Sequence, residues 1–81
     1  MYFVYVLKST RAKKIYTGIT SDIGRRLSEH NKGLSLYTKR FSPWKLIYKE
    51  EVRDRIQARV REKYLKFCAG RKWISQNIFD S

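Results

Sequence analysis

Hydrophobic and polar positions divide the first twenty residues into two short apolar runs. Residues 2–7 and residues 15–19 are both rich in β-branched and aromatic side chains, and a polar stretch separates them. Two such runs joined by a short polar segment predict a β-hairpin. If the turn is centred on residues 10–11, positions that sum to 21 pair across it. This register places Tyr5 opposite Tyr16 on one side of the sheet.

The following segment has the period of an amphipathic helix. Its apolar side chains recur at helical spacing, at Ile23, Leu27 and Leu34. His30 falls on the same stripe, Arg26 flanks it one turn earlier, and Gly33 stands near the end. A polar side chain before the stripe can cap the helix, and the candidates are Thr20, Ser21 and Asp22.

Residues 34–40 have mixed polarity, and we assign no helix or strand to them. Pro43 then marks the entry to a third strand, Trp44 to Tyr48. Asp54 caps a longer helix that runs to about Cys68, before Gly70, and a short last helix follows from about residue 71 to 79.

The element order is therefore strand, strand, helix, strand, helix, helix. We expect an α+β fold, in which three helices flank a small, three-stranded, mostly antiparallel sheet. At 81 residues the chain is near the low end of what folds on one core, and we expect a single domain spanning residues 1–81.

The long helix carries apolar residues on two sides. At 100° per residue, one arc contains Ile56, Val60, Tyr64 and Phe67, and a roughly opposite arc contains Ala58, Glu62, Leu65 and Ala69. Such a helix is covered on both sides, or is covered on one and lines a cleft with the other. A carboxylate at Glu62 needs a cation or hydrogen-bond donors there, and either an arginine or a divalent metal can serve.

The net charge of the chain gives information about its binding partner. Nineteen Lys and Arg residues outnumber seven Asp and Glu residues, which gives a net charge of +12. This excess indicates a polyanionic partner, with nucleic acid as the leading candidate. Disorder is excluded because 42% hydrophobic and 15% aromatic residues supply enough apolar surface for a core.

Cysteine content and apolar run length bear on the compartment. Cys68 is the only cysteine, so the chain forms neither an internal disulfide nor a thiolate zinc cage. The apolar run at residues 2–7 is too short for a signal peptide or a membrane span. We therefore expect a cytoplasmic protein without a membrane partner or a small-molecule cofactor, and its oligomeric state stays open.

Four side chains indicate phosphodiester chemistry. Tyr5, Tyr16, Arg26 and His30 supply two phenols, a guanidinium and an imidazole. Such groups can move a proton from water and hold an anionic phosphate while it is attacked. Taken singly, each residue has a more ordinary interpretation: the tyrosines as sheet-packing residues, His30 as a core histidine and Arg26 as a solvated charge. Glu62 is the candidate metal carboxylate, and it can instead pair with Arg59 or Arg61.

These motifs resemble those of the GIY-YIG nucleases, especially the small stand-alone members. Phe3-Val4-Tyr5 looks like the first family motif, and Tyr16-Thr17-Gly18 looks like the second. An arginine ten residues past the second tyrosine falls on Arg26, and a histidine four residues later falls on His30. The departures are Phe3 in place of glycine, Thr17 in place of isoleucine, and no lysine directly after Gly18.

The resemblance implies a metal-dependent endonuclease. The family's metal-binding glutamate falls on Glu62 and its asparagine on Asn77, which would donate a hydrogen bond to the phosphate. Tyr16 would deprotonate water, directly or through His30, and Tyr5 would orient the nucleophile or the phosphate. The cofactor would be Mg²⁺ or Mn²⁺, weakly bound until DNA arrives because one protein carboxylate is few.

The resemblance also assigns Arg26 a task, which is to bind a non-bridging phosphate oxygen. The expected partner is DNA, with RNA also open, and recognition depends on shape more than on sequence because no base-reading helix accompanies the site. Two alternatives remain: a non-catalytic nucleic-acid-binding module, or a small basic protein associated with RNA or the ribosome. Other basic residues are expected to track the phosphate backbone, or simply to form a solvated surface; they are Lys13, Lys14, Arg25, Lys39, Arg40, Lys45 and those from Arg53 to Arg61.

Overall fold

The computed structural model describes residues 1–34, 36–66 and 72 of the chain. Three strands form one antiparallel sheet in the order β2-β1-β3: β1 is Tyr2–Ser9, β2 is Ile15–Thr20 and β3 is Trp44–Val52. The expected α+β class is confirmed, and the expected order of strands and helices is found in this part of the chain with one addition, a short helix between the first helix and the third strand. The expected last helix at 71–79 lies outside the described residues.

The hairpin forms as predicted, but its register is wrong by two residues. Paired positions sum to 23, so Tyr5 lies opposite Gly18 and Tyr16 lies opposite Leu7. The turn is longer than expected because Ser9 closes it, donating its N–H to the carbonyl of Lys14 at 3.0 Å. A shift of two residues preserves the side-chain face of a strand, so Tyr5 and Tyr16 still share one side of the sheet.

The third strand begins after Pro43 as predicted but extends beyond Tyr48 to Val52. The extension accommodates charged residues because one face of this part of β3 is exposed. Lys49 and Glu51 are exposed, and they alternate with half-buried neighbours. The pairing of β3 with β1 shifts between Val6 and Leu7.

Helix α1 spans Ile23–Asn31, and Asp22 is its N-cap. The Asp22 carboxylate accepts the N–H of Arg25 at 3.1 Å, which satisfies one of the donors that a helix start leaves unpaired. The predicted stripe is wrong at Leu34, which is 71% exposed. The helix ends before it, because Gly33 takes a φ of +80° and turns the chain away.

A four-residue helix, α2 at Leu36–Lys39, occupies part of the segment to which we assigned no element. Its sequence carries too few residues to show a helical period. Its place is fixed by tertiary contacts instead: the indole N–H of Trp44 donates to the carbonyl of Thr38 at 2.7 Å. Trp44 is thus a core residue, 3% exposed.

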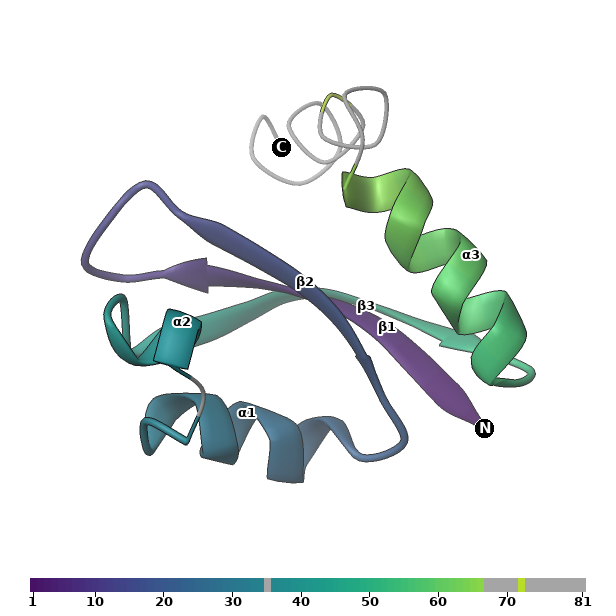
Figure 1. Ribbon diagram of the computed structural model, residues 1–81, viewed down its shortest axis with the longest axis horizontal. Coiled ribbons are helices and arrows are strands. Elements are labelled where there is room, and N and C mark those ends of the chain that lie inside the picture. The colour runs from purple at the N-terminus through teal and green to yellow at the C-terminus, as the bar shows by residue number, and fades with distance from the viewer. Residues whose placement is uncertain (35, 67–71, 73–81) are drawn as a thin grey trace.

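The two faces of the sheet carry separate clusters, one under α1 and one under α3 (Figure 1). Tyr5, Leu7 and Trp44 pack with α1, since Ile23 and Leu27 of that helix lie against them. The residues between them in β1 point the other way and pack with α3; they are Val4 and Val6. The central strand is therefore covered on both faces, and each face receives alternate residues.

Helix α3, at Arg55–Lys66, begins at the predicted cap, because Asp54 accepts the N–H of Gln57 at 2.9 Å. Of its two arcs, the one with Ala58, Glu62 and Leu65 is buried, and the other is exposed in the described residues. The exposed arc contains Ile56, Val60 and Tyr64. None of the described helices combines the length and apolarity needed to cross a membrane.

Gly18 lies at a position in the sheet where there is no room for a side chain. A Cβ atom there would lie 2.7 Å from the Tyr5 hydroxyl and 2.9 Å from the Tyr16 ring. Tyr5 is 2% exposed, so its ring has no space into which to retreat. Packing thus explains the glycine of the second motif, because its missing side chain leaves room for the Tyr5 and Tyr16 rings.

We expect Gly18→Ala to destabilise the fold by about 1–3 kcal/mol, the usual cost of overpacking a filled site. The matched control is Gly24→Ala in α1, where the nearest atom lies 3.7 Å away and alanine favours the helix by up to about 1 kcal/mol. Denaturant unfolding of both variants checks this. Equal stabilities for the two variants would contradict the packing argument.

Candidate active site

Tyr5 and His30 form a buried hydrogen bond between the central strand and α1. The Tyr5 hydroxyl lies 3.0 Å from His30 Nε2, and His30 Nδ1 lies 2.8 Å from the Thr38 hydroxyl. His30 and Thr38 are fully buried. In either neutral tautomer one ring nitrogen donates and the other accepts, so both hydroxyls find a partner. The chain Tyr5–His30–Thr38 therefore links β1, α1 and α2.

Thr38 is a site residue that sequence reasoning missed. It lies in α2, eight positions after His30, and its carbonyl accepts the Trp44 indole N–H. Nothing in the local pattern marks it, since a threonine in a polar segment is ordinary. Only the folding of α2 against Trp44 brings it to the imidazole, where it orients the ring.

Burial keeps both members of the Tyr5–His30 pair neutral. Burial and the neighbouring Tyr16 raise the pKa of Tyr5 to about 12, and the Arg26 guanidinium only partly opposes this rise. Burial and Arg26 lower the pKa of His30, against a smaller opposing effect of Glu29. Near neutral pH, Tyr5 is therefore a protonated hydrogen-bond donor and cannot act as the base.

Tyr16 lies beside this pair and is more exposed than Tyr5. The centre of its ring is 6.2 Å from that of Tyr5 and 4.8 Å from that of His30. Both His30 nitrogens already have partners, Tyr5 and Thr38. This leaves no ring nitrogen to relay a proton from Tyr16, so the direct form of the expected base role fits the geometry better.

Arg26 lies where it acts on both tyrosines. Its pKa is raised, first by a hydrogen bond to Glu29 and then, more weakly, by Tyr5 and Tyr16, while burial opposes these effects. Arg26 Nη1 donates to Glu29 Oε1 at 2.9 Å, and Arg25 lies 3.8 Å from the other oxygen of that carboxylate. Glu29 was not among the predicted site residues, although its spacing from Arg26 on a helix could have indicated it.

Glu62 reaches the site from the opposite layer. Its helix packs on the face of β1 that carries Val4 and Val6, whereas the tyrosines lie on the α1 face. Its charge nevertheless contributes to raising the Tyr5 pKa, as the smallest of the causes. The two layers meet at β2, because β2 is an edge strand and α3 contacts it. The candidate site residues that the structure describes therefore do not surround one cavity; they approach the β2 edge of the sheet from two layers.

A groove of about 320 Å³ marks this edge. It continues from α1 past the end of β2 to the start of α3, and three guanidinium groups line it: Arg25, Arg26 and Arg55. Glu29 is the one carboxylate among its described lining residues. An anion entering the groove would meet cations from both layers of the fold.

The side-chain chemistry at Glu62 fits a hard divalent cation only weakly. Glu62 is 8% exposed, and its oxygens lie 3.6 Å from Arg59 and 3.3 Å from Lys66. Arg61, the other expected partner, pairs with Glu50 instead. No group of three or more His, Cys, Asp or Glu side chains gathers within the described ranges. Such a carboxylate suits an ion that takes most ligands from water and substrate phosphate.

The remaining predicted residues are dispersed. Asn77 lies outside the described residues. Of the predicted backbone-binding cations, Lys13 and Lys14 lie exposed in the β1–β2 loop, Arg25 in α1, and Lys39 and Arg40 at the end of α2. The others are exposed at Lys45, Arg53, Arg55 and Arg59, whereas Arg61 is half-buried.

Residues 1–71 match the GIY-YIG catalytic domain, and the chain belongs to this family of nucleases. Its similarity to curated proteins points the same way. It is 40% identical over 67 residues to a UPF0213 protein of Desulfotalea psychrophila, covering 80% of this chain and 60% of that protein's length.

Two other relatives are covered more fully. A UPF0213 protein of Clostridium perfringens is 37% identical over 67 residues, which is 82% of this chain and 71% of the relative. One of Staphylococcus aureus strain Mu50 is 35% identical over 72 residues, which is 88% of this chain and 87% of the relative. A comparison with solved structures finds no match.

The lowered pKa of His30 predicts an acid-sensitive fold. The unfolded chain takes up the imidazole proton near pH 6.5 and the folded chain only at lower pH, so this stability is present above pH 6.5 and is lost as pH falls through the folded pKa. The loss reaches at most about 1.4 kcal/mol per pH unit.

Denaturant unfolding between pH 7 and pH 4.5 checks this with His30→Gln as the reference. The stability difference between the two proteins should shrink as pH falls. His30 is the only histidine, so NMR can follow its ring directly. An imidazole that titrates at or above 6.5 in the folded protein would contradict the burial argument.

Proposed function

We propose that this domain is a metal-dependent endonuclease that hydrolyses phosphodiester bonds in DNA, directed by structure or only weakly by sequence. The buried Tyr5–His30–Thr38 chain carries the proposal, because Tyr16 packs against its imidazole and Arg26 interacts with its phenol. Membership of a nuclease family supports the same activity.

In the proposed reaction, water attacks phosphorus in line with the 3′-oxygen. The water oxygen forms the new bond to phosphorus, the bond from phosphorus to the 3′-oxygen breaks, and Tyr16 takes the water proton. The leaving oxygen takes a proton from solvent, which yields a 5′-phosphate and a 3′-hydroxyl. Tyr5 keeps its proton, because its pKa is about 12, and orients the groups around it.

Arg26 serves the phosphate and the base together. Its planar donors match two phosphate oxygens, and one of its nitrogens, Nη1, donates to Glu29. Arg26 also interacts electrostatically with Tyr16, which keeps a cation near the proposed base. Binding of a phosphate at Arg26 would therefore compete with Glu29 for the same donors.

Glu62 would hold Mg²⁺ or Mn²⁺, and the ion would supply positive charge to stabilise the leaving oxygen. Glu62 must first exchange its contacts with Arg59 and Lys66. Those two cations can turn to the DNA backbone, because their side chains are 59% and 53% exposed. Metal affinity should accordingly rise when DNA is bound.

One observation favours a second function, a non-catalytic nucleic-acid-binding module of the same fold. The acid and the guanidinium on which cleavage depends are both occupied: Glu62 by two cations and Arg26 by Glu29. A site that stays in this state would bind phosphate without cleaving it. The two functions differ in one measurable property, metal-dependent cleavage.

We expect the purified protein to cleave branched, nicked or linear DNA with Mg²⁺ or Mn²⁺ and to stop in EDTA. Tyr16→Phe should lower the rate by about 10²-fold or more, the usual contribution of a general base. Glu62→Gln should do the same. The matched control is Tyr48→Phe, because this tyrosine bonds Glu50 on the other face and should cleave normally. DNA binding with no cleavage would establish the module instead.

We further expect Arg26→Ala to lose turnover by more than it loses DNA affinity, because the proposed contact strengthens as charge develops on the phosphate. Single-turnover cleavage and equilibrium binding in EDTA measure the two losses separately. Equal losses would assign Arg26 to uniform substrate binding and remove it from the chemical step.

A further inference from the structure

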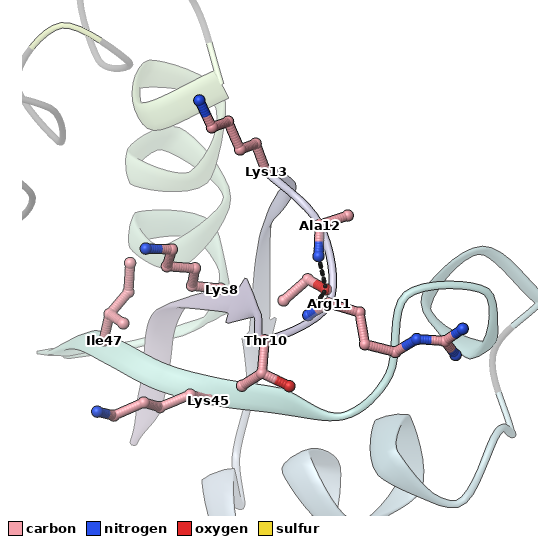
Figure 2. Close-up of a pocket in the computed structure, with 8 residues that line it drawn as sticks. Lys8, Thr10, Arg11, Ala12, Lys13, Lys45 and Ile47 are labelled. Carbon is pink, nitrogen blue, oxygen red and sulfur yellow. Dashed lines mark hydrogen bonds between the residues drawn. The ribbon is translucent and has the colours of Figure 1, made fainter.

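A second hollow lies at the other end of the sheet, under the β1–β2 loop (Figure 2). Its volume is about 620 Å³, within the range of ligand pockets. Figure 2 shows Lys8 on β1, Lys13 in the loop and Lys45 on β3 extending to the same side of the hollow, with Arg11 turned away from them. None of the described residues that line it is acidic.

The loop over this hollow is held in place by a buried hydroxyl. Ser9 Oγ, 3% exposed as a residue, accepts the N–H groups of Arg11 and Ala12 at 3.0 and 3.1 Å and donates to the carbonyl of Phe41 at 2.6 Å. Thr10 donates both its N–H and its hydroxyl to the carbonyl of Pro43. A loop backbone fixed in this way loses less conformational entropy when its cations bind a ligand.

The arrangement of the lysines opposes stability. Lys8 and Lys45 lie directly opposite each other in the β1–β3 ladder, a position where like charges repel. Neither Lys13 nor Lys45 forms an ion pair within the described ranges, and Lys14 adds another cation in an adjoining hollow lined by Lys8, Lys13 and Ile15. The other basic groove, at Arg26, has Glu29 to balance it. A polyanion would relieve this repulsion.

The hollow lies within reach of the same nucleic acid as the candidate active site. Lys8 is three residues from Tyr5 along β1, a step of roughly 10 Å at about 3.3 Å per residue, but this odd spacing turns the Lys8 side chain to the opposite, α3 face of the sheet. A nucleic acid would therefore pass around the end of the sheet, past Lys13 in the β1–β2 loop, to reach both places. Phosphates of one DNA strand recur about every 3.4 Å of helix axis, so the step along β1 corresponds to about three nucleotides.

We propose that Lys8, Lys13 and Lys45 form a phosphate-binding subsite for the nucleic-acid backbone flanking the cleaved phosphate, with Lys14 at its margin. This deepens the proposed function and rests on it for the identity of the polyanion. The subsite positions the substrate and reads no bases, because lysine ammonium groups make point contacts to phosphate.

The test is the salt dependence of binding to a fluorescent DNA duplex, measured by anisotropy in EDTA so that no cleavage occurs. The double variant Lys13→Gln/Lys45→Gln should make the negative slope of log K against log salt shallower by about 1.8, since each lost phosphate contact removes about 0.9. The matched control removes two charges elsewhere, in Lys32→Gln/Lys63→Gln, and should leave the slope nearly unchanged.

Equal slope changes in the two double variants would overturn the subsite, and so would competition by poly-glutamate as effective per charge as competition by DNA. Thermal unfolding separates binding from folding: Lys45→Gln should melt at the same or a higher temperature, because it removes the repulsion with Lys8. Since this assay needs no cleavage, a failed nuclease assay leaves its result decisive, and the reverse also holds.

Discussion

The hydrogen bond between Tyr5 and His30 is the interaction on which the rest of the site depends. It joins the central strand to α1 across 25 residues of chain, and Thr38 completes it from α2. Its partners are buried polar groups, and each is stable inside the fold only because the other satisfies its hydrogen-bonding capacity. Removing either would leave an unpaired donor or acceptor in the core and would release the surface against which Tyr16 packs.

The position of β2 decides what chemistry this arrangement can perform. As an edge strand it leaves one side of the sheet open, so α1 and α3 can both bring charged groups to it from opposite faces. Arg26 and Glu62 consequently belong to different layers and do not neutralise each other; each has a partner on its own helix. A phosphate with its metal ion is the kind of ligand that would bridge such separated opposite charges.

Much of this architecture is encoded locally. Runs of β-branched and aromatic residues predicted β1 and β2, and a helical period predicted α1. Asp54 was the predicted cap of the long helix, and Asp22, one of three candidates, caps α1. The spacing of Tyr5, Tyr16 and Arg26 pointed to the family, which the match over residues 1–71 confirms. Even the misplaced hairpin register kept both tyrosines on one face, because side chains alternate with a period of two.

The sequence by itself thus determined the class of fold, the order of the three strands and of α1 and α3, and the residue types of the candidate site, since these follow from short-range periodicity and charge. Only the tertiary structure decided the hairpin register, the existence of α2, the recruitment of Thr38 and the approach of Glu62 from the opposite face. Each of these depends on contacts between segments distant in the chain. A local sequence pattern does not indicate which distant residue will hydrogen-bond a buried hydroxyl or pack at the edge of a sheet.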